Sequence, residues 1–346
     1  MTSWKILISI LATFALAYLT GCSTSPTSRS SPAPLTELQM QTLSTFHRLD
    51  DFPLYEMHYY GDYPIHRLVP AGFRSDNSES GKPQGDPFDC TSFTALSDKR
   101  EKLFGKNFDW PKHPVLLLFT SPQTGYASIS MTDLSLVGFS ADQTTPQALR
   151  CLLQTVDFPL DGMNAAGLAV SYMTVSTADR GYDRGRMTIG GLDIVRIWLD
   201  YAGNVDDALA LLSHYNLDFG GRPGHYLIAD AAGNAAVVEF VEGEVKVTRE
   251  HKPWQVAANF TVFTVEPEKR RSQSYRYLVT DQELERNEGN ITMTQAFRLL
   301  QEVSQDHGPM PTQWSAVYNM RTGEVQVVMN RQYGQIHHFA LKMRGE

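Results

Sequence analysis

Short hydrophobic runs separated by polar turns cover most of the chain, and their spacing predicts a mixture of strands and helices. Alternating or continuous apolar runs rich in β-branched and aromatic residues predict strands at 90–97, 105–110, 114–119, 126–131, 167–172, 225–229, 235–241, 244–248, 313–319, 324–329 and 336–343. Apolar residues recurring every three or four positions predict helices at 35–49, 189–201, 204–215, 273–284 and 294–303. Short turns between neighbouring strands favour antiparallel pairing, so the fold class is α+β.

A cysteine and an aspartate are brought together by one of the predicted hairpins. The first strand begins at Cys90, and the second contains the block Gly105-Lys106-Asn107-Phe108-Asp109. The polar turn 98–101 joins the two strands. Folding of this hairpin places the Asp109 region beside Cys90.

The N-terminus has the layout of a secretory signal. Lys5 precedes an apolar run from Ile6 to Leu19, which is short for a membrane span. The run ends in Leu19-Thr20-Gly21-Cys22, which matches the bacterial lipobox, so we expect a signal peptide at 1–21 and a lipid on Cys22. An ordinary signal peptide with an incidental cysteine is the alternative. Residues 22–35, rich in Ser, Pro and Thr, then form a flexible tether.

The remaining chain divides at the cysteine of the hairpin. Residues 36–89 read as a small pro-segment whose Gly/Ser/Asn/Pro-rich stretch 75–85 forms a loop leading to Asp89. Residues 90–346 read as one large domain, and an apolar content of 42% supports a substantial core.

The charge and cysteine content restrict the possible partners and the expected state of the cysteines. A formal net charge of −8 without a basic cluster argues against a nucleic-acid partner. Three cysteines in an exported chain raise the question of a disulfide. With Cys22 assigned to the lipid, we expect Cys90 and Cys151 to remain thiols, Cys151 as a buried structural residue.

The hairpin block resembles the linear-amide C–N hydrolases of the N-terminal nucleophile (Ntn) superfamily, which include bile salt hydrolases, penicillin V acylases, acid ceramidases and N-acylethanolamine acid amidases. These enzymes have a cysteine followed by a G-R-N-x-D motif, and Lys106 stands here at the arginine position. Three later segments also resemble the family: 161–170, where Ala165 replaces the usual glutamate, 258–260 around Asn259, and 274–277 around Arg276. The resemblance extends from Cys90 to the C-terminus and does not cover 23–89.

The resemblance implies a four-layer αββα sandwich and a mechanism that needs no cofactor and no metal. The Cys90 thiol attacks the Asp89 carbonyl, and hydrolysis of the thioester leaves Cys90 as a new N-terminus. Its α-amino group, with a pKa of about 7.7–8.0, then serves as the base for its own thiol.

It also assigns roles to five residues. Asp109 accepts hydrogen bonds from the freed amine, Asn259 donates to the oxyanion, and the backbone N–H of Thr174 is the second oxyanion donor. Arg276 is an active-site arginine. Lys106 keeps a positive charge that lowers the thiol pKa but lacks the planar fork of arginine.

The implied activity is hydrolysis of a small-molecule N-acyl amide by a lipoprotein of the bacterial cell envelope. Cys22 anchors it to the membrane, the outer membrane facing the periplasm if the host is Gram-negative; whether it forms a homo-oligomer is open. Aromatic and methionine residues near the motifs suit an apolar acyl pocket and equally suit the core: Phe108, Trp110, Met163, Tyr172, Met173 and Trp314.

Three other functions stay open. One is an acyltransferase of the same fold. The second is a papain-like hydrolase in which Cys90 pairs with His225 or another histidine. The third is a non-catalytic lipoprotein that binds acyl ligands or a partner. A fragment beginning at Cys90 would distinguish the Ntn mechanism from the last two.

Overall fold

The computed structural model describes residues 34–63, 90–139, 141, 146–306 and 308–345. The expected signal peptide, Cys22, most of the expected tether and Asp89 lie outside these residues. Residues from Leu35 to Glu346 form one compact unit. Among the described residues, no helix is long and apolar enough to cross a bilayer.

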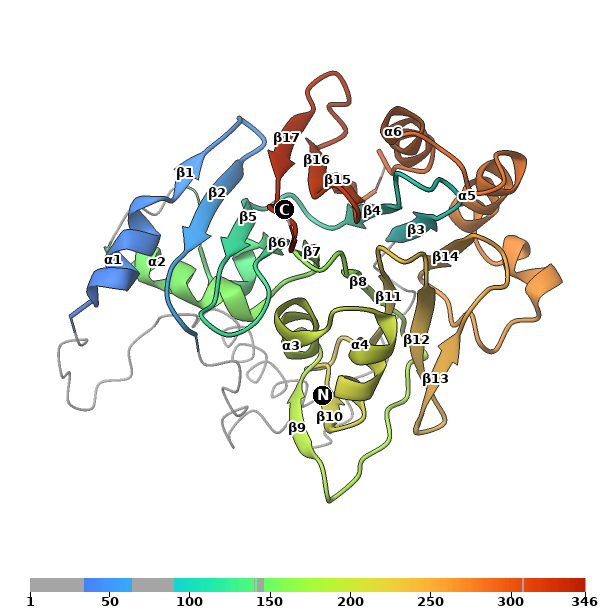
Figure 1. The fold of residues 1–346 in the computed structure, drawn as a ribbon, viewed down its shortest axis with the longest axis horizontal. Helices are drawn as coiled ribbons and strands as arrows, with labels where there is room; N and C mark the ends of the chain where they lie inside the picture. The colour runs from blue at the N-terminus through green and yellow to red at the C-terminus, as the bar shows by residue number, and fades with distance from the viewer. Residues whose placement is uncertain (1–33, 64–89, 140, 142–145, 307, 346) are drawn as a thin grey trace, which may run out of the picture. The chain divides into compact units, whose positions relative to one another are not determined.

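The larger of two main sheets has nine strands in the order β1-β2-β5-β6-β7-β8-β11-β12-β13 (Figure 1). Neighbouring strands are antiparallel, except that β2 runs parallel to β5. The strands are β1 (His47–Arg48), β2 (Leu54–Tyr59), β5 (Val115–Thr120), β6 (Ser128–Asp133), β7 (Asp161–Asn164), β8 (Ala169–Thr174), β11 (Gly224–Ala229), β12 (Ala235–Val241) and β13 (Glu244–Thr248).

The smaller main sheet has six strands, all antiparallel, in the order β14-β3-β4-β15-β16-β17. They are β14 (Trp254–Ala258), β3 (Thr91–Ala95), β4 (Leu103–Asp109), β15 (Thr312–Asn319), β16 (Glu324–Met329) and β17 (His337–Ala340). The expected hairpin around Cys90 is therefore β3–β4. A separate parallel pair joins β9 (Met187–Gly190) to β10 (Tyr215–Asp218).

Helices cover the outer faces of the two sheets. On the nine-stranded sheet, α3 packs on β7 and β8, while α5 and α6 pack on the six-stranded sheet. The helices are α1 (Glu37–Ser44), α2 (Pro146–Cys151), α3 (Asp193–Tyr201), α4 (Val205–Leu212), α5 (Tyr275–Arg286) and α6 (Met293–Glu302), with 3₁₀ turns η1 (Leu134–Val137), η2 (Leu152–Asp157) and η3 (Pro267–Ser272).

The two sheets face each other across the main hydrophobic core. Strand β3 contacts β11 and β14 contacts β12, and one cluster of buried side chains joins β4 and β15 to β8 and β11. A second cluster fills the space between the six-stranded sheet and α5 and α6. The expected four-layer αββα sandwich is therefore observed.

The segment before Cys90 is part of this architecture. Strand β2 inserts between β1 and β5, and its Leu54 and Met57 are fully buried. The described part of the expected pro-segment thus belongs to the same compact unit as the rest of the chain.

Several element predictions were incomplete. The strands β1, β2, β7, β9, β10 and β14 and the helix α2 were missed. The helix expected from residue 189 begins at Asp193, because Met187–Gly190 pairs with β10 instead. The sequence of β7, Asp-Gly-Met-Asn, has no β-branched residue, so pattern and propensity gave no signal for it. Cys90 and Cys151 are both buried, and neither is part of a disulfide, as expected.

Candidate functional site

The β3–β4 hairpin sets which side chains face the inside of the sandwich. In β4, Phe104 and Phe108 belong to the core between the sheets, so the alternation of a strand places Lys106 on that same inner face. Lys106 lies opposite Ser92, whose hydroxyl is 2.8 Å from that of Ser171 on the facing sheet. Cys90, two residues before Ser92, is buried in the same inner core, with 3% of its surface exposed.

The glycine that opens the block has a packing reason. Gly105 lies opposite Phe93 in the ladder, and a Cβ at position 105 would come within 2.4 Å of the Phe93 ring. Only glycine leaves room for this ring on the strand, which keeps the hairpin in register.

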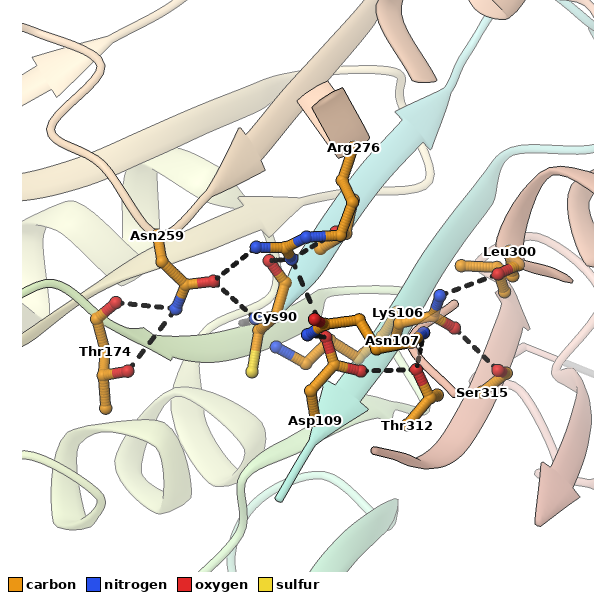
Figure 2. Close-up of polar contacts among 12 residues, drawn as sticks. Cys90, Lys106, Asn107, Asp109, Thr174, Asn259, Arg276, Leu300, Thr312 and Ser315 are labelled. Carbon is orange, nitrogen blue, oxygen red and sulfur yellow. Dashed lines mark hydrogen bonds and ion pairs between the residues drawn. The ribbon is translucent and has the colours of Figure 1, made fainter. Parts of the chain in front are cut away.

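Two side chains from distant parts of the chain hold the backbone of Cys90 (Figure 2). Its N–H donates to Oδ1 of Asn259, and its carbonyl accepts a hydrogen bond of 2.6 Å from Nη1 of Arg276. The same Arg276 nitrogen donates to the hydroxyl of Thr91 at 2.9 Å. Both side chains were expected at this site from the sequence, and the structure places them there.

Asn259 also connects the two sheets. It follows the last residue of β14, and its Nδ2 donates to the carbonyl of Thr174, the last residue of β8, at 2.8 Å. In the uncut chain the side-chain carbonyl of Asn259 therefore faces Cys90, while an amide N–H faces Thr174. The roles of Asn259 and Thr174 as oxyanion donors stay predictions.

The carboxylate of Asp109 is bound by other partners than the Cys90 nitrogen. Oδ1 accepts from the Thr312 hydroxyl at 2.6 Å, Oδ2 accepts from Gln305 at 2.9 Å, and Arg276 lies 3.7 Å away. Burial raises the pKa of Asp109 to about 6, although Arg276, Thr312 and Gln305 favour the charged form. The nitrogen of Cys90 is a peptide nitrogen here, so the predicted contact with a freed amine concerns the cut protein.

Burial dominates the electrostatics of the thiol. It raises the pKa of Cys90, while the positive charge of Lys106, a hydrogen bond from the Asp109 backbone and the charge of Arg276 act in the opposite direction. The charge of Lys106 thus lowers the thiol pKa as expected, but desolvation outweighs this effect in the uncut chain.

Lys106 is itself fully buried and is part of a small charged group behind the thiol. Its Nζ donates to the carbonyl of Tyr172 at 3.0 Å. Asp161, also fully buried, accepts from Trp314 Nε1 at 3.0 Å and from the Tyr318 hydroxyl at 2.5 Å. Burial raises the pKa of Asp161 to about 6, and the charge of Lys106 partly opposes this.

Three polar residues of the site had no role in the sequence analysis: Asp161, Gln305 and Thr312. Asp161 begins the 161–170 block, and its position in a family-like motif was the available signal. Gln305 lies in the segment between α6 and β15, and Thr312 is the first residue of β15, so only the fold brings them to Asp109.

A cavity of about 460 Å³ lies against Asn259 and Arg276, and its lining is mainly polar: Asn259, Phe260, Gln273, Ser274, Tyr275, Arg276, Glu302, Val303, Ser304 and Gln305. None of the six side chains considered for an acyl pocket lines this cavity. Phe108, Met163, Tyr172, Met173 and Trp314 are buried in the core, and only Trp110 is partly exposed. The core alternative therefore holds for five of the six.

Among the residues that the structure describes, no histidine is placed to pair with Cys90. Nδ1 of the buried His225 is 3.1 Å from Oε1 of Glu239, and among the described residues no hydrogen bond or ion pair joins Cys90 to a histidine. Over the same described ranges, no group of three or more His, Cys, Asp or Glu side chains is arranged to hold a metal ion.

Comparison with known proteins identifies the family. The model of the acyl-coenzyme A:6-aminopenicillanic acid acyl-transferase family matches residues 158–332, just over half of the chain. The chain belongs to this family. The matched region contains Thr174, Asn259 and Arg276 and begins after the β3–β4 hairpin. No curated protein sequence matches the chain.

Two solved structures have the same fold. A variant of conjugated bile acid hydrolase from Clostridium perfringens is 15% identical with a TM-score of 0.53, covering 72% of this chain and 92% of its own. Penicillin V acylase from Agrobacterium tumefaciens is 16% identical with a TM-score of 0.51, covering 69% of this chain and 83% of its own. The resemblance to Ntn hydrolases is thus confirmed at the level of family and fold.

Proposed function

We propose that this protein is an amidohydrolase that cleaves the linear C–N bond of an N-acyl substrate with Cys90 as an N-terminal nucleophile. The observation that carries the proposal is that three groups form hydrogen bonds with Cys90. Asn259 accepts from its N–H, Arg276 donates to its carbonyl, and the Asp109 backbone donates to its thiol. Such convergence on one cysteine is typical of a nucleophile that must be held in one orientation.

The proposed maturation converts this buried peptide unit into the active form. The thiol adds to the Asp89 carbonyl, the C–N bond to Cys90 breaks, and the nitrogen leaves as an amine. Water then hydrolyses the thioester and releases the Asp89 carboxylate and the thiol. The new amine can take the thiol proton, since an α-amino group titrates near neutral pH.

Catalysis then repeats the same bond changes on a substrate. The thiolate attacks the amide carbonyl, the amine leaves, and water hydrolyses the acyl-thioester. Asn259 supports the oxyanion, with the backbone N–H of Thr174 as second donor. Asp109 holds the α-amine. The polar cavity beside Asn259 and Arg276 is the proposed binding place for the polar part of the substrate.

Maturation and activity are tested on the same preparation. Wild-type protein purified from its host should contain a heavy fragment whose N-terminal sequence begins at Cys90, and Cys90→Ala should stay uncut. The preparation is then assayed for amide hydrolysis with penicillin V and a glycine-conjugated bile acid among a panel of N-acyl amides. Full activity of a protein with an intact Asp89–Cys90 bond would refute the mechanism.

An acyltransferase is the second candidate, because the family model that matches the chain is named for an acyl-transferase. Both reactions share the acyl-thioester, and they differ in whether water or an amine accepts the acyl group. Adding 6-aminopenicillanic acid to the assay distinguishes them: a transferase forms a new amide, whereas a hydrolase releases the free acid.

We further propose that the protein is a lipoprotein of the bacterial cell envelope, anchored through Cys22. The support is the Leu19-Thr20-Gly21-Cys22 sequence after an apolar run and the Ser/Pro/Thr-rich stretch that follows. Wild-type protein should fractionate with membranes, and Cys22→Ser should shift it to the soluble fraction. Wild-type protein found only in the soluble fraction would contradict the anchor.

A further inference from the structure

Asn259 is carried by a turn that has no regular secondary structure of its own. Strand β14 ends at Ala258, and residues 259–265 run from there toward η3. A side chain on such a segment is positioned only as well as the contacts that hold the segment. On one side, Arg276 of α5 donates to Oδ1 of Asn259 at 3.4 Å and Phe260 packs edge-on against Tyr277. Further contacts come from the opposite, nine-stranded sheet.

The strongest of them is made by one buried carboxylate. Glu239 of β12 accepts the backbone N–H of Val262 through Oε1 and that of Phe263 through Oε2, both at 2.7 Å. Only 1% of its surface is exposed. Since an ionised carboxylate is purely an acceptor, Nδ1 of His225, 3.1 Å from Oε1, is the third donor, which assigns its proton to Nδ1.

Two weaker contacts act on the same turn. The hydroxyls of Thr177 and Thr261 are 2.7 Å apart, and Asn259 itself donates to the Thr174 carbonyl. All three anchors therefore fix the turn to β8, β12 and the residues that follow β8.

We infer that Glu239 is a positioning residue for Asn259: by fixing Val262 and Phe263 to β12, it holds the Asn259 amide between Cys90 and Thr174. The inference rests on the proposed function for its catalytic consequence. Its structural part, the coupling of Glu239 to the Asn259 side chain, can be measured without a substrate.

Replacement by glutamine probes this arrangement without changing side-chain size. The glutamine oxygen can accept one of the two backbone N–H groups, but its NH₂ then faces the other donor. A buried N–H is left without an acceptor, and a charge-assisted bond is lost, so the turn should move away from β12.

A buried carboxylate elsewhere in the fold provides the matched control. Asp230, 2% exposed, accepts the backbone N–H of Val205, Ala232 and Asn234. Asp230 follows the last residue of β11. Thr174 pairs with the first residue of that strand, Gly224, so Asp230 lies at the opposite end of β11 from Thr174. Asp230→Asn therefore removes a similar carboxylate at a distance from the Asn259 turn.

The first measurement is the side-chain NH₂ resonance of Asn259 in asparagine-labelled protein, assigned by its loss in Asn259→Ser. It should shift in Glu239→Gln and stay in place in Asp230→Asn, each compared as folded protein by circular dichroism. Hydrogen exchange of the backbone amides of residues 259–265, measured in the folded protein, should accelerate only in Glu239→Gln. An unmoved Asn259 resonance with unchanged exchange would overturn the inference.

The second measurement is steady-state hydrolysis of whichever panel amide the wild type cleaves. Glu239→Gln should lower kcat about 10–100-fold with little change in KM, while Asp230→Asn keeps kcat. Equal loss of kcat in both variants, or full kcat in Glu239→Gln, would overturn the catalytic part. A wild type inactive on the whole panel would count against the proposed function, and the resonance and exchange data would still decide the coupling.

Discussion

The guanidinium of Arg276 binds the backbone carbonyl of Cys90 at 2.6 Å, although 186 residues separate the two in the chain. Arg276 lies in the first turn of α5, outside the six-stranded sheet, and Cys90 immediately precedes β3. The arginine therefore fixes where the strand begins, and its charge also lowers the pKa of the thiol. Its observed contacts are those of a group that orients the backbone of Cys90.

Asn259→Ala tests the proposed oxyanion role. Loss of one oxyanion donor typically lowers turnover about 10²–10³-fold, and we expect this range with little change in KM. The measurement is steady-state hydrolysis by protein already cut before Cys90, because the same substitution also removes the acceptor of the Cys90 N–H in the uncut chain. Near wild-type turnover would mean that the residue is misassigned.

Asp109→Asn tests whether this carboxylate serves the freed amine. The substitution keeps one oxygen for Thr312 or Gln305 but removes the negative charge that would hold a protonated α-amine. We expect a marked loss of hydrolysis in cut protein. Cleavage of the uncut chain should be affected less, because its Cys90 nitrogen donates to Asn259. An equal loss in both steps would contradict this division of roles.

Lys106→Met removes the buried positive charge while keeping an unbranched side chain of similar length. The thiol pKa should rise, because Lys106 is the largest influence that lowers it. The check is the rate of Cys90 alkylation by iodoacetamide as a function of pH, with the label located by mass spectrometry. Lys106→Arg keeps the charge and should leave the profile nearly unchanged; a Met variant with the wild-type profile would refute the electrostatic role.

Asp161→Asn should change how stability depends on pH. The pKa of Asp161 is about 6 in the folded protein, against 3.8 for an ordinary aspartate, so between these values the folded state binds more protons than the unfolded state. The wild type therefore loses stability from this group as pH rises from about 4 to 6, and the variant does not. Urea unfolding measures the free energy of unfolding of both proteins across this range. Relative to the wild type, the value for the variant should rise by roughly 3 kcal/mol or less as the pH increases. A pH-independent difference would contradict the raised pKa.

A feature of the fold or the site could be predicted from the sequence where neighbouring residues encode it, and not where it depends on contacts between distant parts of the chain. The β3–β4 hairpin was predictable because a polar turn separates two short segments with strand-like sequence, and in the structure Lys106 pairs with Ser92 across it. The strand β7 was missed because its short sequence carries no propensity signal. The Asp109 partners Gln305 and Thr312 lie after α6 and at the start of β15, and Glu239 lies on β12 of the other main sheet. All three are distant from the hairpin in sequence, so no local pattern could reveal them.

The choice between acyl pocket and core could not be made from the sequence for a related reason. Aromatic and methionine residues beside a motif can line a cavity or fill a core, and only packing decides between them. Phe108 and Trp314 stack at 4.0 Å between their ring centroids and are both buried, which assigns them to the core. Polar residues from α5 and the end of α6 line the cavity instead.

The position of strand β2 has a consequence for any cut made before Cys90. Six residue pairs join β2 to β5 in parallel register, from Leu54–Val115 to Tyr59–Thr120, and Tyr63 donates to the buried Asp200 at 2.8 Å. Breaking one peptide bond would leave all of these contacts in place. The product would be a two-chain complex sharing one β-sheet, so a lipid on the first chain would retain the second at the membrane without any covalent link between them.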